Sequence, residues 1–68
     1  MLRSEEVEQI LREVNKARDD MYDDVIRFRN TKDESSRLIA RMAHSHLLSA
    51  YLELVNAVSL IEELEDRE

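Results

Sequence analysis

The sequence contains no cysteine, no proline and no glycine. Without cysteine the chain has no disulfide, no thiolate metal ligand and no thiol nucleophile, which is compatible with a reducing compartment. Without proline or glycine it lacks the two residue types that most strongly interrupt helices. Apolar residues instead recur at helical spacing along almost the whole chain. The absences and this periodicity together predict an all-α protein.

Long hydrophobic runs are also absent. No stretch reaches about 18 apolar residues, so the sequence predicts no membrane span, and the residues after Met1 lack the apolar segment of a signal peptide. With 43% apolar and 38% charged residues, the chain is too hydrophobic for a disordered protein. We therefore expect a folded, cytoplasmic protein with a single domain, residues 1–68.

Charge is unevenly distributed along the chain, whose net charge is −6. Residues 1–24 hold four basic and eight acidic side chains, residues 25–46 hold five and two, and residues 47–68 hold one and six. The middle of the chain is therefore positive and both ends are negative.

The first helix is predicted from about residue 4 to about residue 30. Ser4 is a favourable N-cap, and Glu5 and Glu6 follow in the first turn, where carboxylates stabilise the positive end of the helix dipole. One face is apolar, as expected of a helix with one buried side. That face consists of Val7, Ile10, Leu11, Val14, Ala17, Met21, Val25 and Phe28.

A polar turn is predicted at about residues 31–35. Thr31 and Glu34 have the spacing of a capping box, and Ser35 is an alternative cap. A second helix then covers about residues 36–66, and so short a turn between long helices favours an antiparallel hairpin. The alternative is one unbroken rod of about 100 Å.

The second helix carries a heptad seam rich in alanine, which allows a neighbouring helix to approach closely. The seam comprises Ala40, Ala43, Leu47, Ala50, Leu54, Ala57, Ile61 and Leu64. Further apolar residues, among them Leu48, Tyr51, Val55 and Val58, widen the apolar arc beyond what one neighbouring helix covers. We therefore expect the hairpin to assemble as a homodimeric four-helix bundle or a larger helical oligomer. The expected oligomer core is Val7, Val14, Met21, Phe28, Leu47, Ala50, Leu54, Ala57, Ile61 and Leu64.

A second register with the same spacing lies on the opposite side of this helix. It consists of Leu38, Met42, Ser45, Ser49, Leu52, Asn56 and Ser59, which we call the outer seam. A solvated face more usually carries Lys, Glu and Gln than serine. The outer seam is either ordinary solvent surface or, in the sharper interpretation, the face that binds another protein.

Polar side chains offer few signs of catalysis. Asp19, Asp20, Asp23 and Asp24 form a cluster that either makes solvated ion pairs with Lys16 and Arg27 or binds a cation such as Mg²⁺. His44 and His46 point to different sides of a helix and cannot chelate one metal ion. Arg18 lies within the apolar face of the first helix, so it either extends to solvent or pairs with an acid such as Glu53 of another chain.

Arg37 to His44 and Arg41 to His46 resemble the Arg-x4-6-His element of HEPN ribonucleases, a fold with four or more helices. This resemblance and the aspartate cluster suggest a metal-dependent or HEPN-like hydrolase fragment as one alternative function.

A basic band near the turn suggests another alternative, contact with nucleic acid phosphates. The band consists of Arg27, Arg29, Lys32, Arg37 and Arg41. The hairpin plan also resembles the Rop family of plasmid copy-control proteins in architecture, small acidic chains that form a dimeric four-helix bundle and bind paired RNA loops. That resemblance implies an RNA- or DNA-binding regulator.

The favoured interpretation is a small non-enzymatic adaptor or regulatory protein that acts through protein–protein interaction. The expected partners are a second copy of the chain and another protein, with nucleic acid as the less favoured partner. We expect no cofactor and no resident metal.

Overall fold

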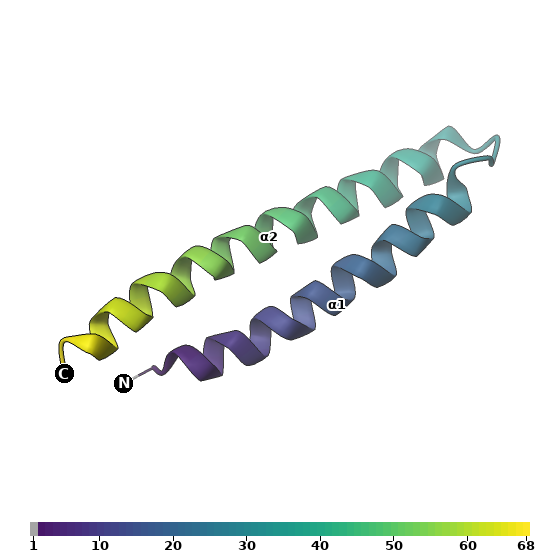
Figure 1. The fold of residues 1–68 in the computed structure, drawn as a ribbon. Coiled ribbons are helices and arrows are strands. Elements are labelled where there is room, and N and C mark those ends of the chain that lie inside the picture. Colours follow the sequence, from purple (N-terminus) through teal and green to yellow (C-terminus); the bar gives the residue numbers. More distant parts are fainter. Residues whose placement is uncertain (1) are drawn as a thin grey trace.

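The computed structural model describes residues 2–68, which form two helices, α1 (Ser4–Phe28) and α2 (Glu34–Asp66). The helices run antiparallel and side by side, and both termini lie at the same end of the molecule (Figure 1). The Cα trace measures 56 × 14 × 13 Å, about half the length of an unbroken helix of this chain. The prediction of an all-α antiparallel hairpin is confirmed, and the unbroken rod is wrong.

The start of α1 differs from the prediction. Arg3, not Ser4, is the N-cap residue, and no side chain of its own segment caps the helix. Ser4 is the first helical residue, and its N–H donates a hydrogen bond of 2.6 Å to Glu65 in the last turn of α2. A residue 61 positions away therefore satisfies one of the free N–H groups that every helix start leaves.

The turn is shifted as well. α1 ends at Phe28, α2 begins at Glu34, and Asp33 is the N-cap. The Asp33 carboxylate accepts hydrogen bonds from the Ser36 N–H at 3.3 Å and from the Ser36 hydroxyl at 2.6 Å. The predicted capping box is wrong, because the Thr31 hydroxyl oxygen instead accepts from the Asp33 N–H at 3.3 Å.

The two helices pack through their apolar faces, but little of this packing is deep. In residues 2–68, only Val7, Ala40 and Val58 are buried hydrophobic residues. The other members of the predicted α1 face and α2 seam are half-buried between the helices, except for Ile10, Ala17 and Leu64, which are exposed. The set expected to form an oligomer core therefore lies, apart from Leu64, between α1 and α2 of one chain.

The alignment of the helices follows from the contacts between them. The Arg18 guanidinium lies 4.8 Å from the centre of the Tyr51 ring. Nearer the turn, the rings of Tyr22 and His44 lie 5.5 Å apart. Arg18 also pairs with an acid of its own chain, Asp19, at 3.7 Å, whereas pairing with an acid of another chain such as Glu53 stays a prediction.

Candidate interaction surfaces

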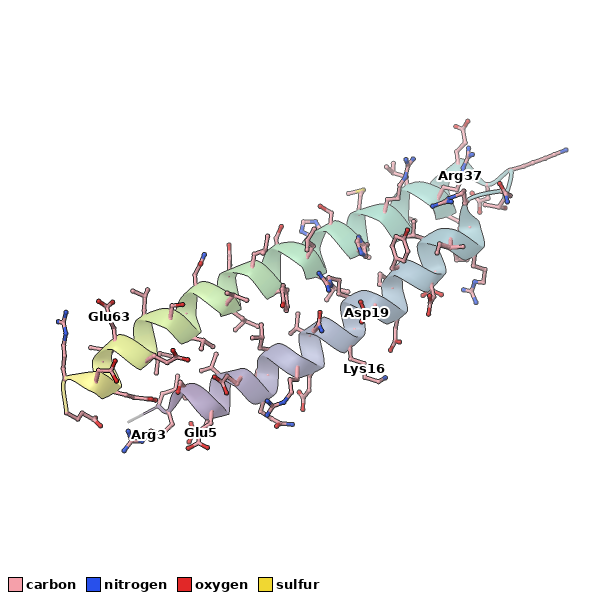
Figure 2. All side chains as sticks on the ribbon, viewed as in Figure 1. Arg3, Glu5, Lys16, Asp19, Arg37 and Glu63 are labelled. Carbon is pink, nitrogen blue, oxygen red and sulfur yellow. The ribbon has the colours of Figure 1, made fainter. Side chains whose placement is uncertain are left out.

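The open end of the hairpin is closed by two polar contacts between α1 and α2. Glu65 accepts a hydrogen bond from the Ser4 N–H at 2.6 Å and another from the Ser4 hydroxyl at 3.0 Å. Arg3 pairs with Glu68 at 3.0 Å, and Figure 2 shows Arg3 at this end of the molecule. The backbone N–H of Ser4, followed by its hydroxyl, lowers the pKa of the Glu65 carboxyl below its ordinary value of 4.5.

Three arginines surround one pocket near the turn. The pocket has a volume of about 250 Å³ and is lined by Val25, Arg29, Arg37 and Arg41. Arg37 lies 3.8 Å from Glu34, which is largely exposed. In the part of the chain that the structure describes, neither Arg29 nor Arg41 forms an ion pair. The pocket is therefore a concentration of positive charge at the turn end.

The remaining members of the predicted basic band lie elsewhere. Arg27 pairs with Asp24 at 3.4 Å, and its guanidinium lies 4.8 Å from the centre of the Phe28 ring. Lys32 is exposed in the connection between the helices. The structure thus brings together three of the five residues expected to contact nucleic acid.

The centre of the same side of the hairpin is amphipathic. Arg18 is held there by the Asn15 side-chain oxygen at 2.7 Å and by the Tyr51 ring, and Asp19 lies 3.7 Å from it. Next to them Tyr22 is 45% exposed, and Leu48 and Val55 are each 37% exposed. Since residues seven apart lie nearly above one another on a helix, Leu48 and Val55 share a side of α2 with Arg41. We call this side, with its arginine pocket, the pocket face.

The outer seam lies on the side of α2 turned away from α1. All seven of its residues are exposed. Leu38, Met42 and Leu52 are each more than half exposed, so the seam presents apolar anchors to solvent. The serines between them leave room for another helix to approach.

The candidate catalytic side chains are engaged in local contacts. Asp20 pairs with Lys16 at 3.1 Å, and Asp24 pairs with Arg27 at 3.4 Å. Among residues 2–68, no group of three or more acidic or histidine side chains is arranged to hold a metal ion.

The histidines of the HEPN-like spacing have separate environments. His44 packs against Tyr22, and His46 is exposed. Arg37 lines the arginine pocket next to Glu34. The spacing that resembled HEPN ribonucleases therefore corresponds to a pocket arginine and a packed histidine.

Glu65, at the start of α1, was not predicted from the sequence, whereas Val25, which lines the arginine pocket, and Tyr51, next to Arg18, were expected only as apolar residues. Tyr51 and Glu65 act through partners on the other helix. Only the correct alignment of the two helices identifies these pairs.

Comparison with protein families, with curated proteins and with solved structures gives no match for this chain. In residues 2–68, neither helix has an apolar stretch long enough to cross a membrane.

Proposed function

We propose that this chain is a small non-enzymatic adaptor or regulatory protein that self-associates and binds another protein through the outer seam. The observation that carries this proposal is the exposure of Leu38, Met42 and Leu52 on the side of α2 opposite α1. A few large side chains usually dominate the energy of a protein interface. Small residues between these anchors allow a partner helix to pack closely.

Self-association is supported by how little the isolated hairpin buries. Chains of this size that lack disulfides and metals usually need another chain to complete their core. Only three hydrophobic residues within 2–68 are buried, whereas twelve large hydrophobic residues are exposed. A homodimeric four-helix bundle, or a larger helical oligomer, covers such surface.

The proposal that the chain is not an enzyme is supported by the packing of two candidate catalytic side chains, Arg18 and His44, against tyrosine rings. The guanidinium of Arg18 lies over Tyr51, and the ring of His44 lies against Tyr22. A catalytic site needs a nucleophile, a base and their orienting groups within hydrogen-bond reach of one another. Packing against tyrosine rings suits a structural role.

The test uses two variants of the outer seam, Met42→Lys and Ser49→Glu. Proteins captured from a lysate by the tagged chain are identified, purified and titrated against each variant. We expect each variant to weaken binding of the true partner at least fivefold, because a charge is then buried against the partner. The variants should leave the self-association constant of the chain within twofold of the wild type.

Matched controls lie on another exposed side of α2. Ile39→Lys and His46→Glu introduce the same side chains as the seam variants, also at exposed positions. Both controls should bind the partner as the wild type does. Equal binding by seam variants and controls would contradict the proposal.

A second candidate function, binding of RNA or DNA, is favoured by one observation: Arg29, Arg37 and Arg41 surround the same pocket. A gel-shift titration over a salt series tests it, because phosphate contacts make affinity fall steeply with salt. If the adaptor proposal is correct, we expect no binding at physiological salt. Binding that the triple change of these arginines to alanine abolishes would support the second candidate instead.

A further inference from the structure

The pocket face changes sign along the hairpin. Its turn end holds the arginine pocket of Arg29, Arg37 and Arg41. The open end has the opposite charge, since residues 1–12 hold two basic and three acidic side chains and residues 57–68 hold one basic and five acidic side chains. The hairpin therefore has a positive turn end and a negative open end. The open end of one copy is complementary in charge to the turn end of another.

Two columns of residues carry this polarity. Residues seven apart lie nearly above one another on a helix, with a drift of about 20° per heptad. From the turn end to the open end, the α1 column is Arg29, Tyr22, Asn15 and Glu8, and the α2 column is Arg41, Leu48, Val55 and Glu62. Both columns border the pocket face, because Arg29 and Arg41 line the same pocket.

The columns have matching symmetry. Each begins with arginine, ends with glutamate and has uncharged residues between, and the two charges are about 31 Å apart along the helix at 1.5 Å per residue. The α1 column is centred between Arg18 and Asp19, and the α2 column between Tyr51 and Leu52. The Arg18 guanidinium lies 4.8 Å from the Tyr51 ring, and Ser4 bonds to Glu65 further along, so the two centres lie at about the same height.

We propose that the pocket face binds a second copy of this chain in antiparallel orientation, so that the arginine pocket of each copy receives carboxylates from the open end of the other. This inference rests on the self-association proposed above. A two-fold axis through the level of Arg18 and Tyr51 places Arg41 opposite Glu62 of the second copy, and Leu48 opposite its Val55. The same rotation places Arg29 opposite Glu8 of the second copy. Such an interface uses the same surface patch on both chains, as two-fold dimers do.

The surface area of the hairpin agrees with an interface of this size. Its accessible surface is 5,351 Å², whereas a compact monomer of 8.1 kDa exposes about 4,500 Å². The excess of roughly 850 Å² is close to the 800 Å² or so that each partner buries in a standard protein interface. Tyr22, Leu48 and Val55 supply exposed apolar surface at the centre of the pocket face.

Charge selects the antiparallel orientation over the parallel one. In a parallel pair through this face, α2 of one copy lies over α1 of the other, and the two arginine pockets meet. Like charges at an interface oppose association. The antiparallel pair also brings Arg18 near its own counterpart at the axis, but each Arg18 already has Asp19 within 3.7 Å and the Tyr51 ring beneath it.

Disulfide trapping tests the orientation, since the chain has no cysteine of its own. An equimolar mixture of Arg41→Cys and Glu62→Cys is equilibrated in a glutathione redox buffer, and crosslinked species are resolved by mass. We expect the mixed disulfide to predominate, because position 41 of one copy faces position 62 of the other and the second Arg41–Glu62 pair stays intact. The mixture of Arg41→Cys with Arg29→Cys should form little mixed disulfide. The reverse result would establish the parallel pair and overturn the proposal.

Charge reversal tests the contact itself. Arg41→Glu and Glu62→Arg should each raise the dissociation constant of self-association at least fivefold at 50 mM salt, with a smaller effect at 0.5 M salt. The double variant Arg41→Glu/Glu62→Arg should return it to within twofold of the wild type. Arg27→Glu and Glu53→Arg are controls, because they change the net charge equally at exposed positions outside the two columns. Circular dichroism checks that each variant keeps its helices.

Three further outcomes would overturn the proposal, and they have different meanings. If the chain dimerises but the column variants and the controls behave alike, the copies meet through another face and the proposed self-association stands. If the wild type is monomeric at every concentration tested, the self-association fails as well. If a short RNA dissociates the dimer and Arg41→Glu abolishes RNA binding, the pocket is a nucleic acid site.

Discussion

Glu65 connects the two helices at the open end of the hairpin through a single carboxylate. One oxygen accepts the N–H of Ser4 and the other its hydroxyl, so the first turn of α1 is capped from α2. Such capping satisfies a free N–H of the helix start and places negative charge at its positive end. The contact also fixes how far the helices are displaced along one another.

The Glu65 contact predicts a specific response to acid. Because the Ser4 N–H lowers the pKa of Glu65 in the folded chain below 4.5, this carboxylate stabilises the fold above pH 4.5. The contribution is lost as the pH falls through the lower folded pKa. Glu65→Gln should therefore be less stable than the wild type at pH 7, and this difference should shrink by pH 3. Urea unfolding at fixed protein concentration measures it.

A control separates the Glu65 contact from the general loss of negative charge. Glu53 is exposed, and no hydrogen bond or ion pair joins it to another residue within 2–68. Glu53→Gln should follow the wild type closely from pH 7 to pH 3. A difference for Glu65→Gln that stays constant with pH would show that the Glu65 carboxylate does not stabilise the folded chain through Ser4.

The Asp33 cap adds a second acid-sensitive contact at the other end of α2. The hydrogen bond from the Ser36 hydroxyl, followed by that from the Ser36 N–H, lowers the pKa of Asp33 below its ordinary value of 3.8. This cap therefore stabilises the helix above about pH 3.8 and is lost as the pH falls further. The starts of both helices thus depend on ionised carboxylates, Glu65 for α1 and Asp33 for α2.

At the scale of the helices, the sequence was sufficient to predict the two elements and the faces that pack. Periodicity gave the apolar side of α1 correctly for Val7, Leu11 and Val14, because a helix keeps a fixed angle between successive residues. It was wrong for Ile10 and Ala17, which are exposed at the edge of that side. Whether a residue at the edge of the apolar side of α1 is buried depends on how α2 is rotated against it.

The helix ends were harder to predict than the helices. Asp33 with Ser36 and Thr31 with Glu34 have the same three-residue spacing, and both are compatible with a helix start. The structure uses Asp33. Ser4 looked like a cap from its neighbours alone, but a distant carboxylate takes that role. Local sequence cannot distinguish these cases, because the choice depends on contacts between the helices.

For the candidate sites as well, spacing along the sequence predicts some features, and the alignment of the two helices decides the others. The exposure of the outer seam was predictable from spacing alone, since its residues lie opposite the alanine-rich seam. The arginine pocket was predictable only as a basic band, because which three arginines converge depends on the alignment of α1 with α2. That alignment also reveals that the charged columns of the two helices share a common centre.

At the scale of the whole molecule, the hairpin is long, thin and sparsely packed. Its Cα trace is 56 Å long but only 13 to 14 Å wide, so most side chains touch solvent. Two helices provide one packing interface, whereas a stable core usually requires elements on more than one side. In the dimer that we propose, a second hairpin supplies the missing layer.

This shape predicts that thermal stability depends on protein concentration. If folding and dimerisation occur together, the melting temperature rises with concentration, because mass action favours the associated state. An unfolding enthalpy of about 0.7 kcal/mol per residue over two chains gives a rise of about 5 °C for each tenfold increase in concentration. Calorimetry from micromolar to millimolar concentration, with sedimentation of the same samples, measures both the shift and the mass. A compact, folded species of 8.1 kDa with a constant melting temperature would show that a single hairpin is stable alone. In that case the exposed side chains of the pocket face would be ordinary surface of a monomer.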